Sequence, residues 1–330
     1  MTAQIHNQDR APVLAVEGLN VRIASENGPF AVVSDMSLSV AAGETVCIVG
    51  ESGCGKSMTA LALLRLLPEA ASVAAGRIEI DGQDFLAMGQ HQVEDYRGEK
   101  IAMIFQEPLT ALNPVLTIGE QIAEGVRQHR KVGKKEAWAR AVEVLKLVQM
   151  PDPTRRATQY PHELSGGMRQ RAMIALALAC EPRIIVADEP TTALDVTIQA
   201  QILGLIKDLQ TRLGTAQVLI THDLGVVAEV ADRVIVMYAG RKVEEASVYE
   251  LFDNPIHPYT RGLMGAIPRG QSADRLTDIA GTVPPLWNLP KGCAFAPRCP
   301  GASARCREER PPFEEKSPGH FAACWEHDNV

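Results

Sequence analysis

The chain has 330 residues, of which 46% are hydrophobic and 22% charged, with a formal net charge of −7. This length accommodates one large α/β domain with an appendage, and the composition is ordinary for a soluble globular protein. The negative charge argues against nucleic acid as a partner, no apolar run reaches the roughly 18 residues of a membrane span, and the N-terminus lacks the basic start and apolar centre of a signal peptide.

The first predicted elements are two strands, over residues 14–23 and 30–40, separated by a turn that contains Gly28 and Pro29. A short apolar run, Thr45-Val-Cys-Ile-Val49, then predicts a buried strand. Apolar residues at helical spacing from 58 to 67, followed by Pro68, predict a helix.

The loop between this strand and this helix fits the pattern G-x-x-x-x-G-K-[ST], and strand, glycine-rich turn and helix is the setting that a phosphate-binding loop requires. Backbone N–H groups in such a loop converge on phosphate oxygens, and the helix start adds a partial positive charge. Lys56 is expected to reach the β- and γ-phosphates, and Ser57 to place its hydroxyl on Mg²⁺. The predicted nucleotide-binding residues here are Gly50, Glu51, Ser52, Gly53, Cys54, Gly55, Lys56, Ser57 and Met58.

The middle of the chain begins with a short alternating strand at 76–82 and a buried strand at 101–105 that delivers Gln106. Residues from about 107 to 165 are predicted to be mostly helical. Within them one buried helical face recurs at helical spacing, formed by Ala137, Ala141, Val144, Leu145 and Val148.

Two motifs with polar residues follow, at residues 164–171 and 188–189. Residues 164–171 read Leu-Ser-Gly-Gly-Met-Arg-Gln-Arg and precede a helix, predicted over 168–180. The apolar strand at 183–187 then ends in Asp188 and Glu189. One carboxylate on a metal ion and one on a water molecule is a division of labour suited to phosphoryl transfer.

An amphipathic helix is predicted over residues 196–213, and another apolar strand over 217–221 is followed directly by His222. Taken together, these motifs resemble the ATP-binding cassette (ABC) ATPases, for which the Leu-Ser-Gly-Gly segment is close to unique. The resemblance implies an α/β P-loop NTPase fold with a RecA-like core, an antiparallel β-subdomain and an α-helical subdomain at about 107–165. The cassette is expected to span residues 1–252.

The resemblance also implies roles for individual residues. Gln106 matches the glutamine that joins the Mg²⁺ shell, together with Ser57 and Asp188, and Glu189 matches the residue that polarises the attacking water. His222 matches the histidine that contacts the γ-phosphate, so the expected catalytic residues are Glu189, His222 and Gln106.

In this family the second half of each ATP site comes from the partner subunit. Ser165, Gly166 and Gly167 are expected to bind the ATP of that subunit. The loop Ala193-Leu194-Asp195 matches the segment at the dimer seam. The position that stacks on adenine falls near the aliphatic Ile23, with Phe30 the nearest aromatic, so the adenine contact stays open.

Beyond the cassette, residues 254–264, 279–285 and 292–299 resemble the C-terminal extension of oligopeptide/dipeptide/nickel importer ATPases. We therefore expect a second domain at 253–330. Four of the seven cysteines lie there, with five, six and seventeen residues between them: Cys293, Cys299, Cys306 and Cys324.

Four thiols on a proline-rich tail in a reducing compartment suggest metal ligation. The spacing lacks the tight pairs of zinc sites and differs from common ferredoxin runs. The resemblance implies a [4Fe–4S] cluster; Zn²⁺ ligation and unligated thiols or disulfides are the alternatives.

The expected function is an ATP-hydrolysing subunit of a di-/oligopeptide ABC importer, using ATP and Mg²⁺ at the cytoplasmic face of the membrane. Its expected partners are a second ATPase subunit (a paralogue rather than a copy), two transmembrane permease subunits and, indirectly, an extracytoplasmic solute-binding protein. The same machinery importing nickel, glutathione or another small solute is an alternative. A soluble ABC ATPase of DNA repair or translation, and a metal- or redox-sensing binding protein, are further alternatives.

Overall fold

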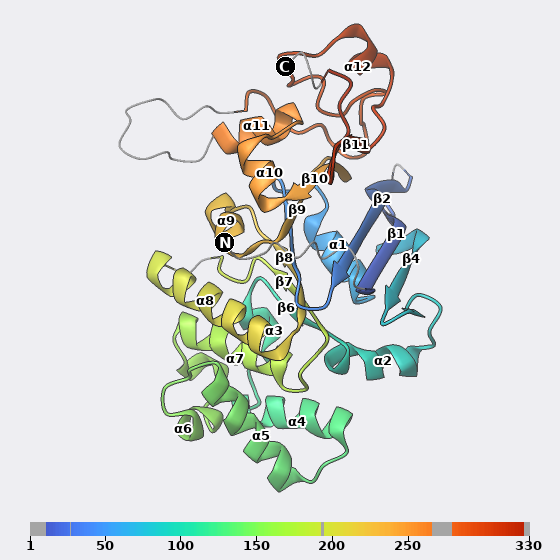
Figure 1. The fold of residues 1–330 in the computed structure, drawn as a ribbon. Helices are drawn as coiled ribbons and strands as arrows, with labels where there is room; N and C mark the ends of the chain where they lie inside the picture. The colour runs from blue at the N-terminus through green and yellow to red at the C-terminus, as the bar shows by residue number, and fades with distance from the viewer. Residues whose placement is uncertain (1–10, 27, 193–194, 266–278, 327–330) are drawn as a thin grey trace. The chain divides into compact units, whose positions relative to one another are not determined.

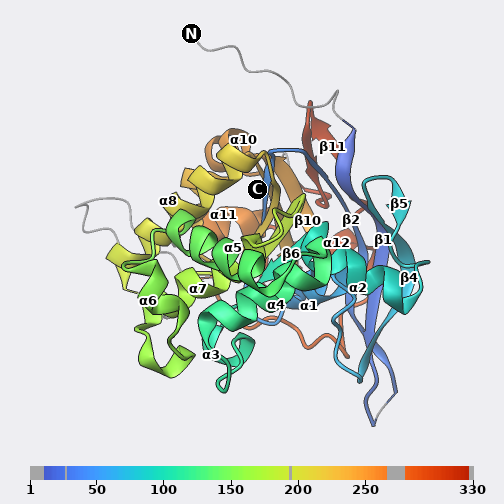
Figure 2. The same ribbon diagram turned by 90° about the horizontal axis from the view of Figure 1, so that it is seen from below.

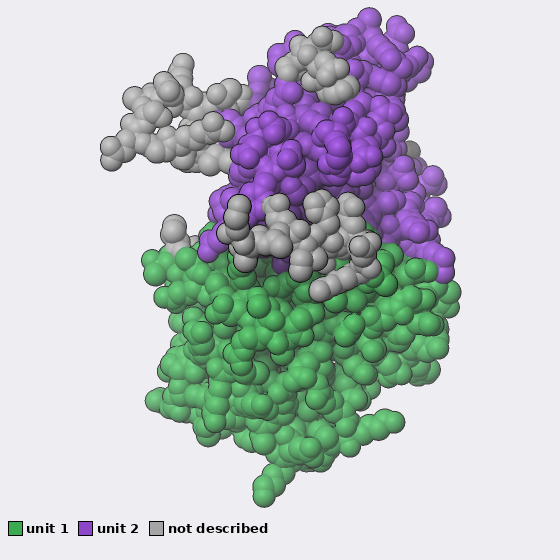
Figure 3. Space-filling model, in the orientation of Figure 1, with its two compact units in different colours: residues 1–15, 39–44, 78–219 green, residues 16–38, 45–77, 220–330 purple. Residues whose placement is uncertain are grey.

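The computed structural model describes residues 11–26, 28–192, 195–265 and 279–326. The chain divides into two compact units, shown in Figure 3. Unit 1 comprises residues 1–15, 39–44 and 78–219, and unit 2 comprises residues 16–38, 45–77 and 220–330. Among the described residues, no helix combines the length and the apolar character needed to cross a bilayer.

Unit 2 contains a mixed set of strands (Figure 1). β3 (Thr45–Val49) pairs in parallel with β9 (Arg233–Tyr238), and β9 pairs antiparallel with β10 (Arg241–Ser247). β10 then pairs with β12 (His320–Ala322), and β12 with β11 (Glu314–Ser317). After their first residues, Thr45 and Arg233, β3 and β9 consist of apolar residues that are all buried, as expected of parallel strands covered on both faces.

The turn between β9 and β10 is made by Ala239 and Gly240, both with positive φ, which matches the twist of a two-residue hairpin. The helices of unit 2 are α1 (Lys56–Leu63), α9 (Leu224–Val230), α10 (Val248–Asp253), α11 (Pro258–Gly265) and α12 (Ala304–Glu308). α9 packs on β3, and α10 packs on β9 and β10. The last two strands of the chain, β11 and β12, thus belong to the same sheet as β3, the strand that precedes the glycine-rich loop.

In unit 1, β6 (Ile101–Ile104) pairs in parallel with β7 (Ile184–Asp188), and β8 (Ala216–Ile220) is the next strand along. The helices that pack together are α4 (Ile118–Arg130), α5 (Lys134–Leu147), α6 (Pro153–Ala157) and α7 (Gly166–Leu178) (Figures 1 and 2). The other helices are α2 (Gln90–Glu99), α3 (Pro108–Ala111) and α8 (Val196–Leu213), and a 3₁₀ turn spans Pro161–Glu163. α5 buries Ala137, Ala141, Val144 and Leu145, the face predicted from their spacing.

A smaller sheet has the strand order β2-β1-β4-β5. Its strands are β1 (Pro12–Ile23), β2 (Phe30–Ala41), β4 (Ala71–Ile80) and β5 (Gln83–Asp84), and β1, β2 and β4 each have residues in both units. β4 begins five residues before the predicted strand. Gly76 lets it approach β1, because a Cβ there would lie 2.6 Å from the Leu19 Cα.

Candidate nucleotide-binding site

The glycine-rich loop joins β3 to α1, and two of its glycines are required by close backbone contacts. A Cβ on Gly50 would lie 2.3 Å from the Met237 carbonyl oxygen, and one on Gly55 would lie 2.5 Å from that of Val32. Gly55 also has a φ of 99°, which side-chain-bearing residues rarely adopt. The loop is therefore held tightly between β2 and β9, and its backbone shape does not tolerate a side chain at these positions.

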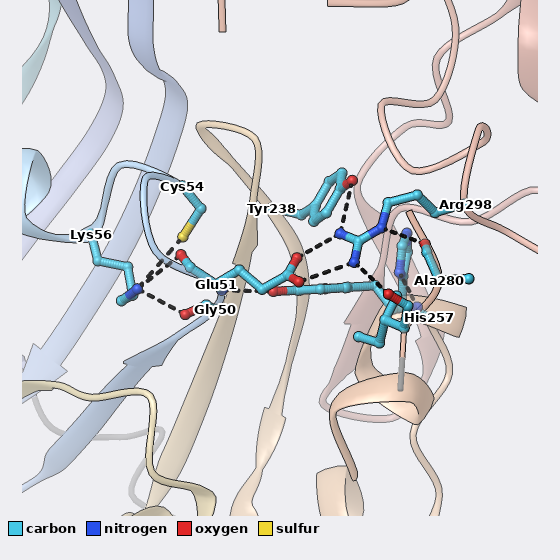
Figure 4. Close-up of polar contacts among 10 residues, drawn as sticks. Gly50, Glu51, Cys54, Lys56, Tyr238, His257, Ala280 and Arg298 are labelled. Carbon is cyan, nitrogen blue, oxygen red and sulfur yellow. Dashed lines mark hydrogen bonds and ion pairs between the residues drawn. The ribbon is translucent and has the colours of Figure 1, made fainter. Parts of the chain in front are cut away.

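Lys56 is folded back over this loop (Figure 4). Its Nζ donates to the carbonyl oxygens of Gly50, at 2.8 Å, and Glu51, at 3.1 Å, and it lies 3.9 Å from the Cys54 Sγ. The side chain is buried, so its positive charge lies in the loop itself. This charge and the N-terminus of α1 make the loop suited to an anionic group.

α1 ends at Leu63, four residues before the predicted end. Arg65 adopts a left-handed φ of 54°, its N–H donates to the Ala62 carbonyl, and the Leu66 N–H donates to the Leu61 carbonyl. This pair of hydrogen bonds is the Schellman arrangement that closes helix C-termini. The turn stops the helix before Pro68 is reached.

In unit 1, Gln106 and Glu189 meet because they follow neighbouring parallel strands. β6 and β7 pair Ile104 with Ala187, so their carboxyl ends lie at one edge of the sheet. The Glu189 Oε2 accepts from the Gln106 Nε2 at 3.1 Å and from the Thr192 Oγ1 at 2.8 Å. Asp188, the last residue of β7, is buried. Thr192 was not among the predicted site residues. Its position three residues after Glu189 is the sequence feature that could have indicated this hydrogen bond.

The signature segment forms the N-terminus of α7. The Ser165 Oγ accepts from the Met168 N–H at 3.4 Å. Arg169 fixes the preceding turn by donating to the carbonyl oxygens of Pro161, at 2.8 Å, and His162, at 3.3 Å. The exposed Ser165 side chain therefore lies on a turn with a defined backbone path.

The signature helix also packs closely on α8. A Cβ on Gly167 would lie 3.1 Å from the Ile198 Cγ2, and the N–H of the same Ile198 donates to the Asp195 carboxylate at 3.0 Å, which caps α8. Ala193 and Leu194, the other residues of the predicted dimer-seam loop, lie outside the described residues. Gly167 and Asp195 thus share one neighbour.

His222 follows β8 and is exposed. The next residue, Asp223, caps α9 by accepting from the N–H groups of Gly225, at 2.9 Å, and Val226, at 3.3 Å. His222, residues 50–58 and the four tail cysteines belong to unit 2, whereas unit 1 contains Gln106, Ser165, Gly166, Gly167, Asp188, Glu189 and Asp195. Phe30, considered for the adenine contact, packs edge-on against Trp287 with ring centroids 5.9 Å apart.

The four tail cysteines are free thiols that line one small cavity of about 20 Å³. Across residues 11–26, 28–192, 195–265 and 279–326, no group of three or more His, Cys, Asp or Glu side chains is placed to hold a metal ion. The cavity has room for about one water molecule. Burial also raises the pKa of the Cys293, Cys299 and Cys324 thiols, which disfavours the thiolate that a metal needs. The predicted [4Fe–4S] cluster is therefore wrong, and nothing supports zinc in its place.

Solved structures with the same fold are ATP-binding cassettes. A dimeric cassette in a post-hydrolysis state, bound to ADP and Pi, superposes with a TM-score of 0.65 at 29% identity, covering 71% of this chain and 98% of that one. The protein cbiO1 of Clostridium perfringens, which is part of the ABC transporter complex cbiONQ, superposes with a TM-score of 0.63 at 26% identity, covering 74% of this chain and 91% of that one. The fold and the glycine-rich loop thus define an ABC-type ATPase.

The family models and the relatives extend the match to the tail. The family "ABC transporter" matches residues 33–192, and "Oligopeptide/dipeptide transporter, C-terminal region" matches residues 243–306. A probable peptide ABC transporter ATP-binding protein of Sinorhizobium fredii is 54% identical over 96% of each chain. The dipeptide transport ATP-binding protein DppD of Bacillus subtilis is 48% identical over 96% of this chain and 95% of its own. The oligopeptide transport ATP-binding protein OppD of Escherichia coli is 45% identical over 98% and 96%. The chain belongs to the ATP-binding subunits of the oligopeptide/dipeptide ABC transporter family.

Proposed function

We propose that this chain is the ATP-hydrolysing subunit that energises an importer of di- and oligopeptides. The observation that carries the proposal is the near full-length similarity to relatives named for peptide transport, at 45–54% identity and with the tail included. Residues 1–252 form the cassette in this proposal, with a helical subdomain at about 107–165, and residues 253–330 form the extension.

In the proposed mechanism, residues 50–58 bind the phosphates of ATP through backbone N–H groups and Lys56. Lys56 must first leave the carbonyl oxygens of Gly50 and Glu51, which it now contacts. Ser57, Gln106 and Asp188 would hold Mg²⁺, because hydroxyl, amide and carboxylate oxygens are the ligands that this ion prefers. When bound, Mg²⁺ neutralises charge on the phosphates.

Glu189 acts on the attacking water as the general base in this proposal. Its carboxylate is oriented by Gln106 and Thr192, so the base is held in place before the water arrives. Gln106 contacts the base and lies two residues after the end of β6, and it can therefore report the state of the site to the helices that follow. His222 is proposed to contact the γ-phosphate.

Each ATP is proposed to lie between two ATPase subunits. Ser165, Gly166, Gly167 and Asp195 of this chain would complete the site of a second subunit, for which a paralogue is favoured. ATP binding would bring the two ATPase subunits together and hydrolysis would separate them. The helical subdomain would transmit this movement to two permease subunits at the cytoplasmic face of the membrane. An extracytoplasmic binding protein would deliver the peptide to those subunits.

The test is transport by the complete assembly. The chain is co-purified with its permeases and second ATPase, reconstituted in vesicles with the external receptor, and supplied with ATP. We expect ATP-dependent uptake of labelled di- or oligopeptides that is lost with Glu189→Gln. Uptake of nickel or glutathione without any peptide uptake would overturn the proposed cargo.

A further inference from the structure

The C-terminal extension reaches the phosphate-binding loop through an ion pair between Arg298 and Glu51 (Figure 4). Arg298 Nη1 donates to the Glu51 Oε2 at 2.6 Å, and Nη2 donates to the Glu51 Oε1 at 3.0 Å. The Arg298 side chain is 4% exposed and that of Glu51 is 30% exposed. Two parallel charge-assisted hydrogen bonds of this kind fix direction as well as distance.

The guanidinium itself is held from the side of the extension. Its Nε donates to the Ala280 carbonyl oxygen at 3.0 Å, and Nη2 donates to that of Ile279, also at 3.0 Å. Nη1 additionally lies 3.4 Å from the Tyr238 hydroxyl. Because its donors are engaged in this way, Arg298 presents a fixed fork to Glu51 rather than a mobile charge.

A second residue after the cassette holds the backbone of Glu51. The Tyr259 hydroxyl accepts from the Glu51 N–H at 2.7 Å. The Tyr259 ring is fully buried and packs against Tyr238 and Phe295, with centroids 4.7 and 5.5 Å away. Both the carboxylate and the backbone N–H of Glu51 are therefore tied to rigid neighbours.

Glu51 is also a residue that Lys56 contacts, through the Glu51 carbonyl oxygen. A carboxylate in a loop that binds a polyanion opposes binding unless its charge is neutralised. Arg298 supplies that neutralisation and keeps the loop in one conformation, so less ordering is left to be done when a ligand arrives.

We propose that Arg298, supported by Tyr259, is a positioning residue for the nucleotide site. The C-terminal extension thereby stabilises the conformation of the phosphate-binding loop that binds ATP. This inference rests on the proposed ATP-binding role of residues 50–58. It gives the extension a task in ATP binding that does not depend on a metal centre.

The experiment measures ATP affinity of the full chain by titration calorimetry, and the KM and kcat for ATP in the assembled transporter. Arg298→Gln should weaken ATP binding about tenfold, which corresponds to roughly 1.4 kcal/mol, and should raise KM with little change in kcat. Arg298→Lys should be intermediate, since lysine cannot form the double hydrogen bond. Tyr259→Phe should weaken binding by a smaller factor.

The decisive comparison is the double variant Glu51→Gln/Arg298→Gln. Removing the carboxylate that Arg298 neutralises should restore much of the lost affinity, so the two substitutions should not add. Arg305→Gln is the matched control, because this arginine forms an exposed ion pair with Glu309 on the same extension. It should bind ATP like the wild type.

Equal ATP affinity in Arg298→Gln and Arg305→Gln would overturn the inference, as would a double variant that is weaker than Arg298→Gln. A lowered melting temperature with unchanged affinity of the folded protein would also overturn it. If Arg298→Gln does not fold, Arg298→Lys and Tyr259→Phe decide by the same criterion. A wild-type chain that does not bind ATP would instead refute the proposed function.

Discussion

At the scale of single residues, Glu189 is notable because one of its carboxylate oxygens accepts two hydrogen bonds. The donors are Gln106, from the end of the neighbouring strand, and Thr192, from the turn that follows. Glu189 also has a φ of 45°, which is uncommon for a residue with a side chain. Such strain is typical of functional sites, where the surrounding contacts maintain it.

Glu189→Gln should therefore bind ATP but hydrolyse it about 100-fold more slowly or worse, because an amide cannot accept the proton of the attacking water. ATP binding without turnover should keep the two ATPase subunits associated around the unhydrolysed ATP. ATPase rates of the assembled transporter, together with size-exclusion chromatography in ATP, check both effects. Glu94→Gln, on the exposed face of α2, is the control, and unchanged turnover in Glu189→Gln would remove Glu189 as the base.

His257 gives a second prediction at this scale. Burial lowers its pKa to about 4, despite the nearby Glu244 carboxylate, and its Nδ1 accepts from the Tyr259 N–H at 3.1 Å. The unfolded chain therefore binds a proton at higher pH than the folded chain does. The contribution of His257 to stability is complete above the ordinary pKa of 6.5 and is lost as the pH falls toward 4.

Between about pH 7.5 and about pH 5, this protonation should cost the wild type roughly 2 kcal/mol of unfolding free energy. His257→Gln should lack that component, so its loss over the same interval should be smaller by this amount. Urea denaturation at the two pH values measures the difference. His91→Gln, fully exposed on α2, should behave like the wild type; a His257→Gln variant with the wild-type loss would contradict the assignment.

At the scale of elements, one buried carboxylate joins three parts of unit 2. Glu244 in β10 is fully buried and accepts from the N–H groups of Ile256, at 2.6 Å, and His257, at 2.9 Å. Its Oε1 also lies 2.7 Å from the Nε2 of His320 in β12. The chain just before α11 and the last strand are thus tied to the sheet at one point.

Glu244→Ala should lower the unfolding free energy by about 3 kcal/mol, since it leaves buried donors without an acceptor. The matched control is Glu309→Ala, which removes an exposed ion pair and should cost less than about 1 kcal/mol. Urea denaturation compares the two. A cost for Glu244→Ala no larger than that of the control would show that this carboxylate does not hold the extension.

At the scale of the whole molecule, one chain carries one phosphate-binding loop and one signature segment. In the proposed arrangement the two act on different ATP molecules. Changes in the two segments should therefore have separable effects, and only one of them should alter ATP binding by the isolated chain.

Lys56→Ala should abolish ATP binding by the isolated chain. Ser165→Arg should leave that affinity unchanged, but it should reduce turnover of the assembled transporter about 100-fold, as expected for loss of a preorganised donor to the reacting phosphate. Ser317→Arg, on the exposed strand β11, is the control for added charge. The two-chain arrangement fails if the isolated chain, carrying Ser165→Arg, hydrolyses ATP at the full rate.

Some elements could be predicted because their signals are local. The amphipathic helix expected at 196–213 has those bounds, since Asp195 caps its start and Gly214 provides the left-handed residue at its end. The strand, glycine-rich loop and helix at 45–63 likewise follow from residues adjacent in sequence. Periodicity, caps and glycine conformations act over a few residues, and the sequence alone is enough to identify them.

Other features depended on residues far apart in the chain. Arg298 lies 247 positions from Glu51, and no local pattern links them. The tail cysteines are close in sequence, but their spacing gives neither the size of the cavity that they line nor the burial that raises the pKa of three of these thiols. The sequence by itself determined the loop, the signature segment and the family. Only the tertiary structure decided what holds the loop in place, because packing selects the partners of a buried charge.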